Sequence, residues 1–112
     1  MSPQRKGIIM LLIREIMHCK PGKVRPMVEK FLAMSKINVK LGMPKMRITT
    51  DFCAEQYWTV VAEMEVENMS AFENMMQGMD QHSAEMKEFE KLMEGYHDLV
   101  ADGRREIYKI EG

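Results

Sequence analysis

The stretch that most constrains the fold is Tyr57–Val66, where side chains alternate, followed at once by the segment NMSAFE. Alternation with a period of two is typical of a strand that buries one face. Either Asn68 or Ser70 can cap a helix, and Ser70 with Glu73 forms a capping-box pattern. The chain therefore passes directly from a half-buried strand into a helix. The face predicted to be buried carries Trp58, Val60, Ala62, Met64 and Val66.

The residues before this strand predict a strand, a helix and a second strand. Residues 7–19 are rich in Ile and Leu and indicate a buried strand that ends at KPGK. A helix with Pro21 or Pro26 in its first turn should then run to about Leu41, before Gly42. Its expected apolar face carries Val24, Met27, Val28, Phe31, Leu32, Ser35, Val39 and Leu41.

Residues 43–53 alternate again and predict a second strand, with Phe52 on the same apolar side as Ile48. The short turn AEQ should join it to the Trp58 strand as a hairpin. Both cysteines end predicted strands, two inter-strand spacings apart. That separation is roughly 10 Å, beyond the reach of a disulfide.

The C-terminal third predicts two helices and a last strand. The helices should cover 69–79 and 83–100, with a break near Gly78 and Asp80 and with Gly103 at the end of the second. Residues 104–110 complete the order strand, helix, strand, strand, helix pair, strand. This order predicts one α+β domain over 1–112, with a ferredoxin-like βαββαβ fold and a four-stranded antiparallel sheet.

The helices should cover the face of the sheet that carries Trp58, and the other face is mixed. It holds Val61 among charged side chains such as Arg47 and Glu63. Apolar area left in water usually marks an interface, so we expect two copies to pack sheet on sheet as a homodimer. In that arrangement Glu63 or Glu65 should meet Arg47 or Arg14.

Composition removes several classes of function. The formal net charge is −1, with no basic stripe, so nucleic acid is not an expected partner. No apolar stretch is long enough to span a bilayer, and we expect a cytoplasmic location with reduced thiols. The chain contains 14 methionines, an unusually large number. This predicts a soft core or an adaptable apolar binding surface.

Three segments, IREIMHCKPGK, YWTVVAEMEVENMSAFENM and GRREIYKIEG, together resemble the dimeric α+β barrel superfamily. Its antibiotic-biosynthesis monooxygenase, NIPSNAP-like and stress-responsive groups share the ferredoxin-like fold. The resemblance implies a homodimer with a pocket between sheet and helices. It also implies a choice among cofactor-independent oxygenases, haem-degrading enzymes, isomerases, decarboxylases and proteins without known activity. Haem-degrading members use an Asn on the first strand, and residues 7–19 contain none.

The candidate site residues gather at one predicted rim of the sheet. His97 and His18 are the candidate catalytic bases, because histidine exchanges protons near neutral pH. The candidate ligand pocket comprises Trp58, Tyr96, Phe52, Met75 and Met79. Trp58 is either a core residue or a pocket wall. Glu94 and His97 share a helix face, but one such pair does not make a di-iron site, and we expect no metal. Sulfur ligation of copper by the methionines near Gly78 is less favoured than packing.

We therefore hypothesise an enzyme that binds a small apolar or aromatic molecule, with cofactor-independent oxygenation as the leading reaction and no cofactor expected. The alternative is a dimeric binding or stress-response module without catalysis. The two differ in whether a His, Tyr or Arg side chain lies against the face that carries Trp58, or only Met, Leu and Val. A haem-binding protein is a third, disfavoured hypothesis.

Overall fold

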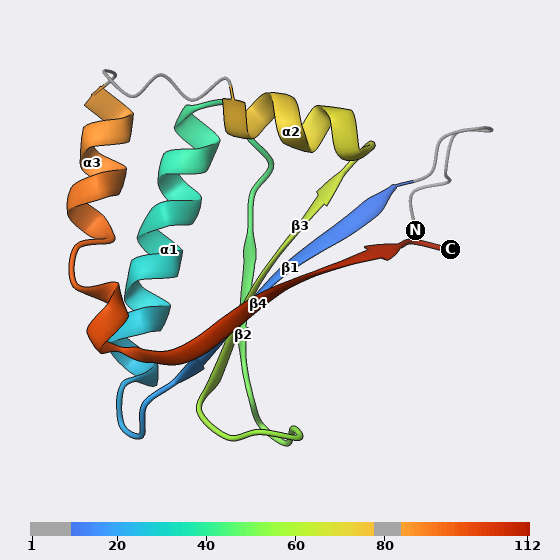
Figure 1. Cartoon of the computed structure of the whole chain (residues 1–112). Coiled ribbons are helices and arrows are strands. Elements are labelled where there is room, and N and C mark those ends of the chain that lie inside the picture. The colour runs from blue at the N-terminus through green and yellow to red at the C-terminus, as the bar shows by residue number, and fades with distance from the viewer. Residues whose placement is uncertain (1–9, 78–83) are drawn as a thin grey trace.

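The computed structural model describes residues 10–77 and 84–112 (Figure 1). Its elements are β1 (Leu11–Cys19), α1 (Val24–Lys40), β2 (Arg47–Thr50), β3 (Thr59–Val66), α2 (Met69–Gln77), α3 (Ala84–Leu92), the 3-10 helix η1 (Tyr96–Asp98) and β4 (Val100–Lys109). This is the predicted order. The first residues of the expected N-terminal strand, the end of the 69–79 helix and the break near Gly78 lie outside the described residues.

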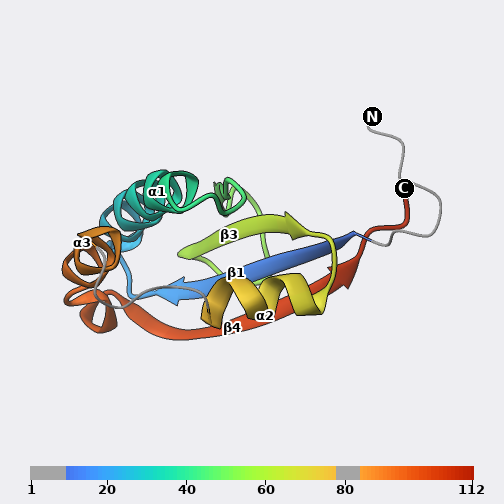
Figure 2. The same cartoon turned by 90° about the horizontal axis from the view of Figure 1, so that it is seen from above.

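The four strands form one sheet in the order β2-β3-β1-β4, and every neighbouring pair is antiparallel. As predicted, β1 and β2 flank β3. All three helices lie on the same side of the sheet (Figures 1 and 2), which we call the covered face. We call the other side the open face. The α+β ferredoxin-like prediction is confirmed.

Helix α1 packs on the sheet along a narrower stripe than the sequence predicts. Pro26 lies in its first turn, and Gly42 takes a left-handed backbone conformation (φ 77°) just after its end. Met27 and Phe31 are buried, but Leu32 is 48% exposed and Val39 is 55% exposed. A helix against a flat layer buries one narrow side, so these two apolar residues at the margin stay in water.

The core forms between α1, α2 and the covered face, around residues that include Ile13, Phe31 and Phe72. Val60, Ala62, Met64 and Val66 belong to this core, so the predicted orientation of β3 is confirmed. The covered face is not wholly apolar, however. Glu15 and Arg105, which are paired neighbours on β1 and β4, form an ion pair there.

Two helix boundaries depend on polar contacts. Asn68 Oδ1 accepts the N–H of Ala71 at 2.7 Å, so Asn68 caps α2 and Ser70 lies inside the helix. At the end of α3, the Lys30 ammonium donates to the carbonyls of Leu92 and Glu94 at 2.7 and 3.0 Å. A cation at this end satisfies carbonyls that have no partner within the helix.

The predicted helix to Val100 and the predicted start of the last strand are wrong. Gly95 has a left-handed backbone (φ 79°), which ends the helical region apart from η1, and β4 begins at Val100. Gly103 is therefore a strand residue opposite Met17. A Cβ on Gly103 would lie 2.6 Å from the Met17 sulfur, so a side chain at this position would have to displace the Met17 side chain.

The hairpin between β2 and β3 is confirmed, but its loop is longer than predicted. β2 ends at Thr50, and Phe52 is fully exposed in the loop, so its expected place on the apolar face is wrong. Trp58 has a positive φ of 63°, which interrupts the alternation before β3 begins. The loop is closed by the N–H of Thr59, which donates to Asp51 Oδ1 at 2.8 Å.

Candidate functional site

A cavity of about 290 Å³ lies between the sheet and the helices. Half of the 14 methionines line it, with four aromatic side chains and three polar ones. We call it the methionine cavity. The lining residues are Met17, Met34, Met43, Met46, Met64, Met76, Met93, Phe31, Phe72, Phe89, Tyr96, Glu15, Asn38 and Arg105. Because thioether side chains are flexible and polarizable, such a wall can adapt to an apolar guest.

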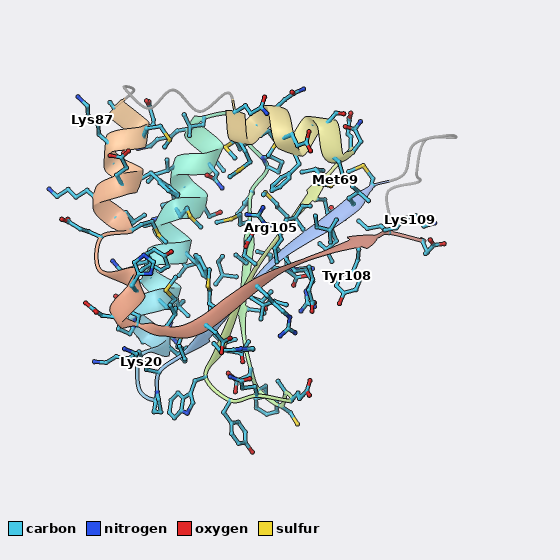
Figure 3. All side chains as sticks on the ribbon, viewed as in Figure 1. Lys20, Met69, Lys87, Arg105, Tyr108 and Lys109 are labelled. Carbon is cyan, nitrogen blue, oxygen red and sulfur yellow. The ribbon has the colours of Figure 1, made fainter. Side chains whose placement is uncertain are left out.

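One wall of the methionine cavity carries a charged pair. Arg105 points from β4 toward the helices, whereas Tyr108 points to the other side (Figure 3). The Arg105 guanidinium pairs with the Glu15 carboxylate and lies 5.1 Å from the centre of the Phe72 ring. These contacts hold the guanidinium against the sheet and neutralise it.

A second hollow of about 510 Å³ adjoins the methionine cavity at the start of β4. The two hollows share Glu15, Met17, Tyr96 and Arg105 as lining residues. His97 lines this outer hollow, and its ring centre lies 3.9 Å from that of Tyr96. We call it the vestibule, because it is the more open of two adjoining spaces. The structure thus brings two of the predicted site residues together at the rim of the sheet.

His18 lies elsewhere, on the open face. It is 8% exposed, and its Nδ1 lies 2.6 Å from Asp102 Oδ1. If Nδ1 carries the proton and donates to the carboxylate, Nε2 is left as an acceptor. His18 lines a broad hollow of about 800 Å³ on the open face, together with Thr59 and the loop after β2. The two candidate bases are therefore on different sides of the sheet.

The other predicted pocket residues do not assemble around the methionine cavity. Trp58 is 44% exposed outside β3, and Phe52 lines the open-face hollow. Met75 packs on the core, whereas its neighbour Met76 lines the cavity. Met79 lies outside the described residues. Sequence reasoning missed Asn38 and the Glu15–Arg105 pair. Glu15 falls on the apolar side of β1, so the alternation of that strand could have indicated it.

The open face carries a connected set of charges. Arg14 lies 3.6 Å from Glu63 and 3.3 Å from Glu106, and Arg47 lies 4.0 Å from Glu63. The predicted meeting of Glu63 with Arg14 and Arg47 is confirmed within one chain. The Tyr108 hydroxyl and the Arg104 guanidinium both donate to Glu106, and these hydrogen bonds lower the pKa of its carboxyl.

The apolar part of the open face is less exposed than the sequence predicts. Ile16 and Val61 are both buried in a single chain. The long side chain of Arg14, held by Glu63 and Glu106, stands on the same face, and the loop after β2 lines the same hollow. Charged side chains cover neighbouring apolar surface with their methylene groups in this way.

The two thiols are free, as predicted. Cys19 is buried, and burial raises the pKa of its thiol, with a further rise from the nearby Asp51 carboxylate. A raised pKa keeps the thiol protonated and makes it a poor nucleophile. Among residues 10–77 and 84–112, no group of three or more His, Cys, Asp or Glu could hold a metal ion. Within the same residues, no helix is long and apolar enough to cross a membrane.

No protein-family model and no curated protein matches the chain. Solved structures do. A NIPSNAP-like domain protein from Burkholderia xenovorans has a TM-score of 0.65 at 13% identity, over 88% of this chain and 82% of that one. A proposed antibiotic biosynthesis monooxygenase from Bacillus cereus has a TM-score of 0.60 at 15% identity, over 93% and 95%.

A third similar structure is a dimeric protein of unknown function with a ferredoxin-like fold from Bacteroides fragilis. Its TM-score is 0.60 at 9% identity, over 90% of this chain and 96% of that one. At such identities the likeness concerns the backbone and not the site. Across nearly its whole length, the chain has the ferredoxin-like fold of these NIPSNAP-like and monooxygenase-like proteins.

Proposed function

We propose that this protein binds a small apolar or aromatic molecule in the methionine cavity. The observation that carries the proposal is the cavity itself, lined mostly by methionine and aromatic side chains and adjoined by a more open vestibule. Its volume of about 290 Å³ is close to the lower end of small-molecule pockets, roughly 300–1,000 Å³. This size suits a ligand of about two fused rings.

Methionine methyl groups give a direct test of binding. Protein labelled with ¹³C at the methionine methyls is titrated with naphthalene, 1-naphthol and 1,4-naphthoquinone, and the methyl resonances are followed by NMR. Saturable shifts confined to methionines of the cavity support the proposal. Shifts only at exposed methionines such as Met69, or no shift with any probe, contradict it.

A matched pair of variants separates the cavity from the surface. Met34→Trp places an indole into the cavity and should abolish probe binding, because Met34 lines it. Met69→Trp adds the same ring on an exposed part of α2 and should leave binding unchanged. Equal effects of the two substitutions count against the cavity.

We further propose cofactor-independent oxygenation of a phenolic ring system as the reaction. In such a reaction a base removes a proton from the substrate, and the resulting anion reduces O₂. A ring CH₂ becomes C=O, and the second oxygen atom leaves as water, so the substrate supplies all the electrons. His97 in the vestibule is the candidate base, because it lies beside Tyr96, which lines both spaces. His18 is the less favoured candidate, since it lines the open-face hollow.

Oxygen uptake decides between catalysis and binding alone. The keto tautomer of 1-naphthol has the required CH₂ group within two fused rings, and its oxidation by O₂ would give 1,4-naphthoquinone and water. We expect His97→Ala to lower the rate of oxygen uptake at least about 100-fold while 1-naphthol binding is retained. His18→Ala is the comparison and should have a smaller effect. Binding without any protein-dependent oxygen uptake favours the alternative, a dimeric binding or stress-response module.

We also propose a homodimer that packs open face on open face. Support comes from the dimeric Bacteroides fragilis protein of the same fold and from the helix-free side of the sheet (Figure 2). Thr49, a half-buried residue that lines the open-face hollow, would then be enclosed. Sedimentation should show dimers that Thr49→Arg dissociates, whereas Ser70→Arg on exposed α2 should not. Monomers of the unmodified protein at all concentrations contradict this interface.

A further inference from the structure

Among the described residues, Asn38 is the one side-chain amide in the wall of the methionine cavity. It lies in the last turn of α1, at the end of that helix next to α2 (Figure 1), and is only 5% exposed. Its backbone carbonyl accepts the N–H groups of Leu41 and Met43 at 3.1 and 2.8 Å. The backbone carbonyl of Asn38 therefore takes part in the turn that ends α1. The side-chain amide does not contribute to this turn.

The side-chain amide of Asn38 has no hydrogen-bond partner among residues 10–77 and 84–112. Within the same residues, every side-chain nitrogen or oxygen atom that solvent cannot reach has a hydrogen-bond partner. The amide is thus reachable although the residue is buried, as expected of a group that faces a cavity. An unbonded amide in apolar surroundings is unfavourable, and asparagine is also a poor residue for a helix interior. A leucine or methionine would avoid both costs.

The charged groups of the cavity are already engaged. Glu15 and Arg105 pair with each other, and Arg105 also lies against the Phe72 ring. Glu15 offsets the charge of Arg105, so a ligand carboxylate would have to compete with Glu15 for this guanidinium. Tyr96 lines both the methionine cavity and the vestibule. Asn38 borders the methionine cavity and not the vestibule, so among the described residues its amide is the uncharged polar group that belongs to the cavity alone.

We propose that Asn38 is a polar anchor that selects a neutral, flat ligand with one hydrogen-bonding oxygen, such as a phenol or a ketone. The inference rests on the proposed function of the methionine cavity. The amide can donate to a ketone oxygen through its NH₂ group, or accept from a phenol through its carbonyl oxygen. A ligand without such an oxygen would leave the amide unbonded, so the site would reject it relative to the phenol.

The test compares 1-naphthol with naphthalene, which differ by one hydroxyl group. In the unmodified protein 1-naphthol should bind about tenfold more tightly, as expected for one net hydrogen bond. Asn38→Leu should bring the two dissociation constants to within about twofold, mainly by weakening 1-naphthol. Met43→Leu, which alters the wall without removing a polar group, should keep the tenfold ratio.

A second readout does not depend on a substitution. The side-chain NH₂ resonances of Asn38 should shift on saturation with 1-naphthol or 1,4-naphthoquinone, and less with naphthalene. Asn38→Ala serves in place of Asn38→Leu if the leucine variant does not fold. Because Ala removes the amide as well, the same loss of preference is expected.

The outcomes separate this inference from the proposed function. If both probes shift the cavity methionines but the affinity ratio is unchanged in Asn38→Leu, the cavity binds ligands and the anchor role is overturned. If neither probe moves those methionines, the proposed function fails and the anchor role with it. If Asn38→Leu binds both probes more tightly, the amide holds a displaceable water and is not an anchor for the ligand.

Discussion

The two faces of the sheet are formed by the same four strands but differ in their chemistry. The covered face meets the helices through methionine, phenylalanine and valine, and leaves a cavity whose wall includes the Glu15–Arg105 ion pair. The open face carries connected charges around Arg14 and Glu106, with His18 bound to Asp102. Successive residues of each strand point to opposite faces, so two surfaces of different chemistry are separated only by the thickness of the sheet.

The difference separates two functions that sequence reasoning placed together. Ligand binding needs a dry and adaptable wall, which the methionine side provides. Specific pairing with another surface needs fixed charges, which the open face provides. His97 belongs to the first surface and His18 to the second, so substitutions at these residues should have separable effects.

The largest effect should appear in stability, when the core side of α1 is compared with its outer side. Phe31→Ala on α1 removes a side chain that is 2% exposed in the core, and should lower the free energy of unfolding by about 3–5 kcal/mol. Leu32→Ala, next to it on the exposed side, should change it by no more than about 0.5 kcal/mol. Urea unfolding followed by circular dichroism measures both. Similar losses would mean that α1 is rotated relative to the packing described above.

A second test breaks the contact between β1 and β4 on the covered face. Gly103→Val places a branched side chain against the Met17 sulfur and the backbone carbonyl of Ile16, and should destabilise by about 1–3 kcal/mol. It should also shift the Met17 methyl resonance, because Met17 must leave its position in the cavity wall. Ala101→Val on the exposed part of β4 is the control, and its effect on stability should be small.

Much of the fold could be predicted because periodicity reports burial directly. The alternation from Val60 to Val66 determines which side of β3 meets the helices, and this holds in the structure. The prediction failed where a single backbone angle overrides the pattern. Trp58 and Gly95 both take left-handed conformations, which moved the indole out of the strand and shortened the last helix. Periodicity carries no signal for such residues.

The site was less predictable, because it is formed between elements distant in the sequence. Tyr96 and His97 were predicted at the rim, since the topology places the end of the helical region there. Asn38 lies seven residues after Phe31, so helical spacing places it on the buried face of α1. Its side chain is polar and was not counted in the apolar stripe, and only the packed structure shows that it borders a cavity. The number of methionines indicated an adaptable surface, but not which half of them would line it.

A smaller effect should distinguish the ion pair of the covered face from those of the open face. Glu15→Gln leaves Arg105 without its carboxylate partner, and should cost no more than about 1 kcal/mol because both side chains reach solvent. The freed guanidinium should then bind 1-naphthoate more tightly than in the unmodified protein. Glu63→Gln removes a carboxylate from the open face and should leave 1-naphthoate binding unchanged. An equal gain in both variants would indicate a general charge effect.

The smallest expected effect concerns pH and the open face. The hydrogen bonds from Tyr108 and Arg104 lower the pKa of Glu106 in the folded protein, so folding favours its ionised form. Its contribution to stability is therefore complete above the unfolded carboxyl pKa of about 4.3, and is lost as the pH falls through the lower folded value. The difference in stability between the unmodified protein and Glu106→Gln should be constant near neutral pH and shrink below about pH 4.3. Urea unfolding at a series of pH values measures this, with Glu111→Gln as a control for the loss of one charge. A difference that does not change with pH would mean that Glu106 acts through packing and not through its charge.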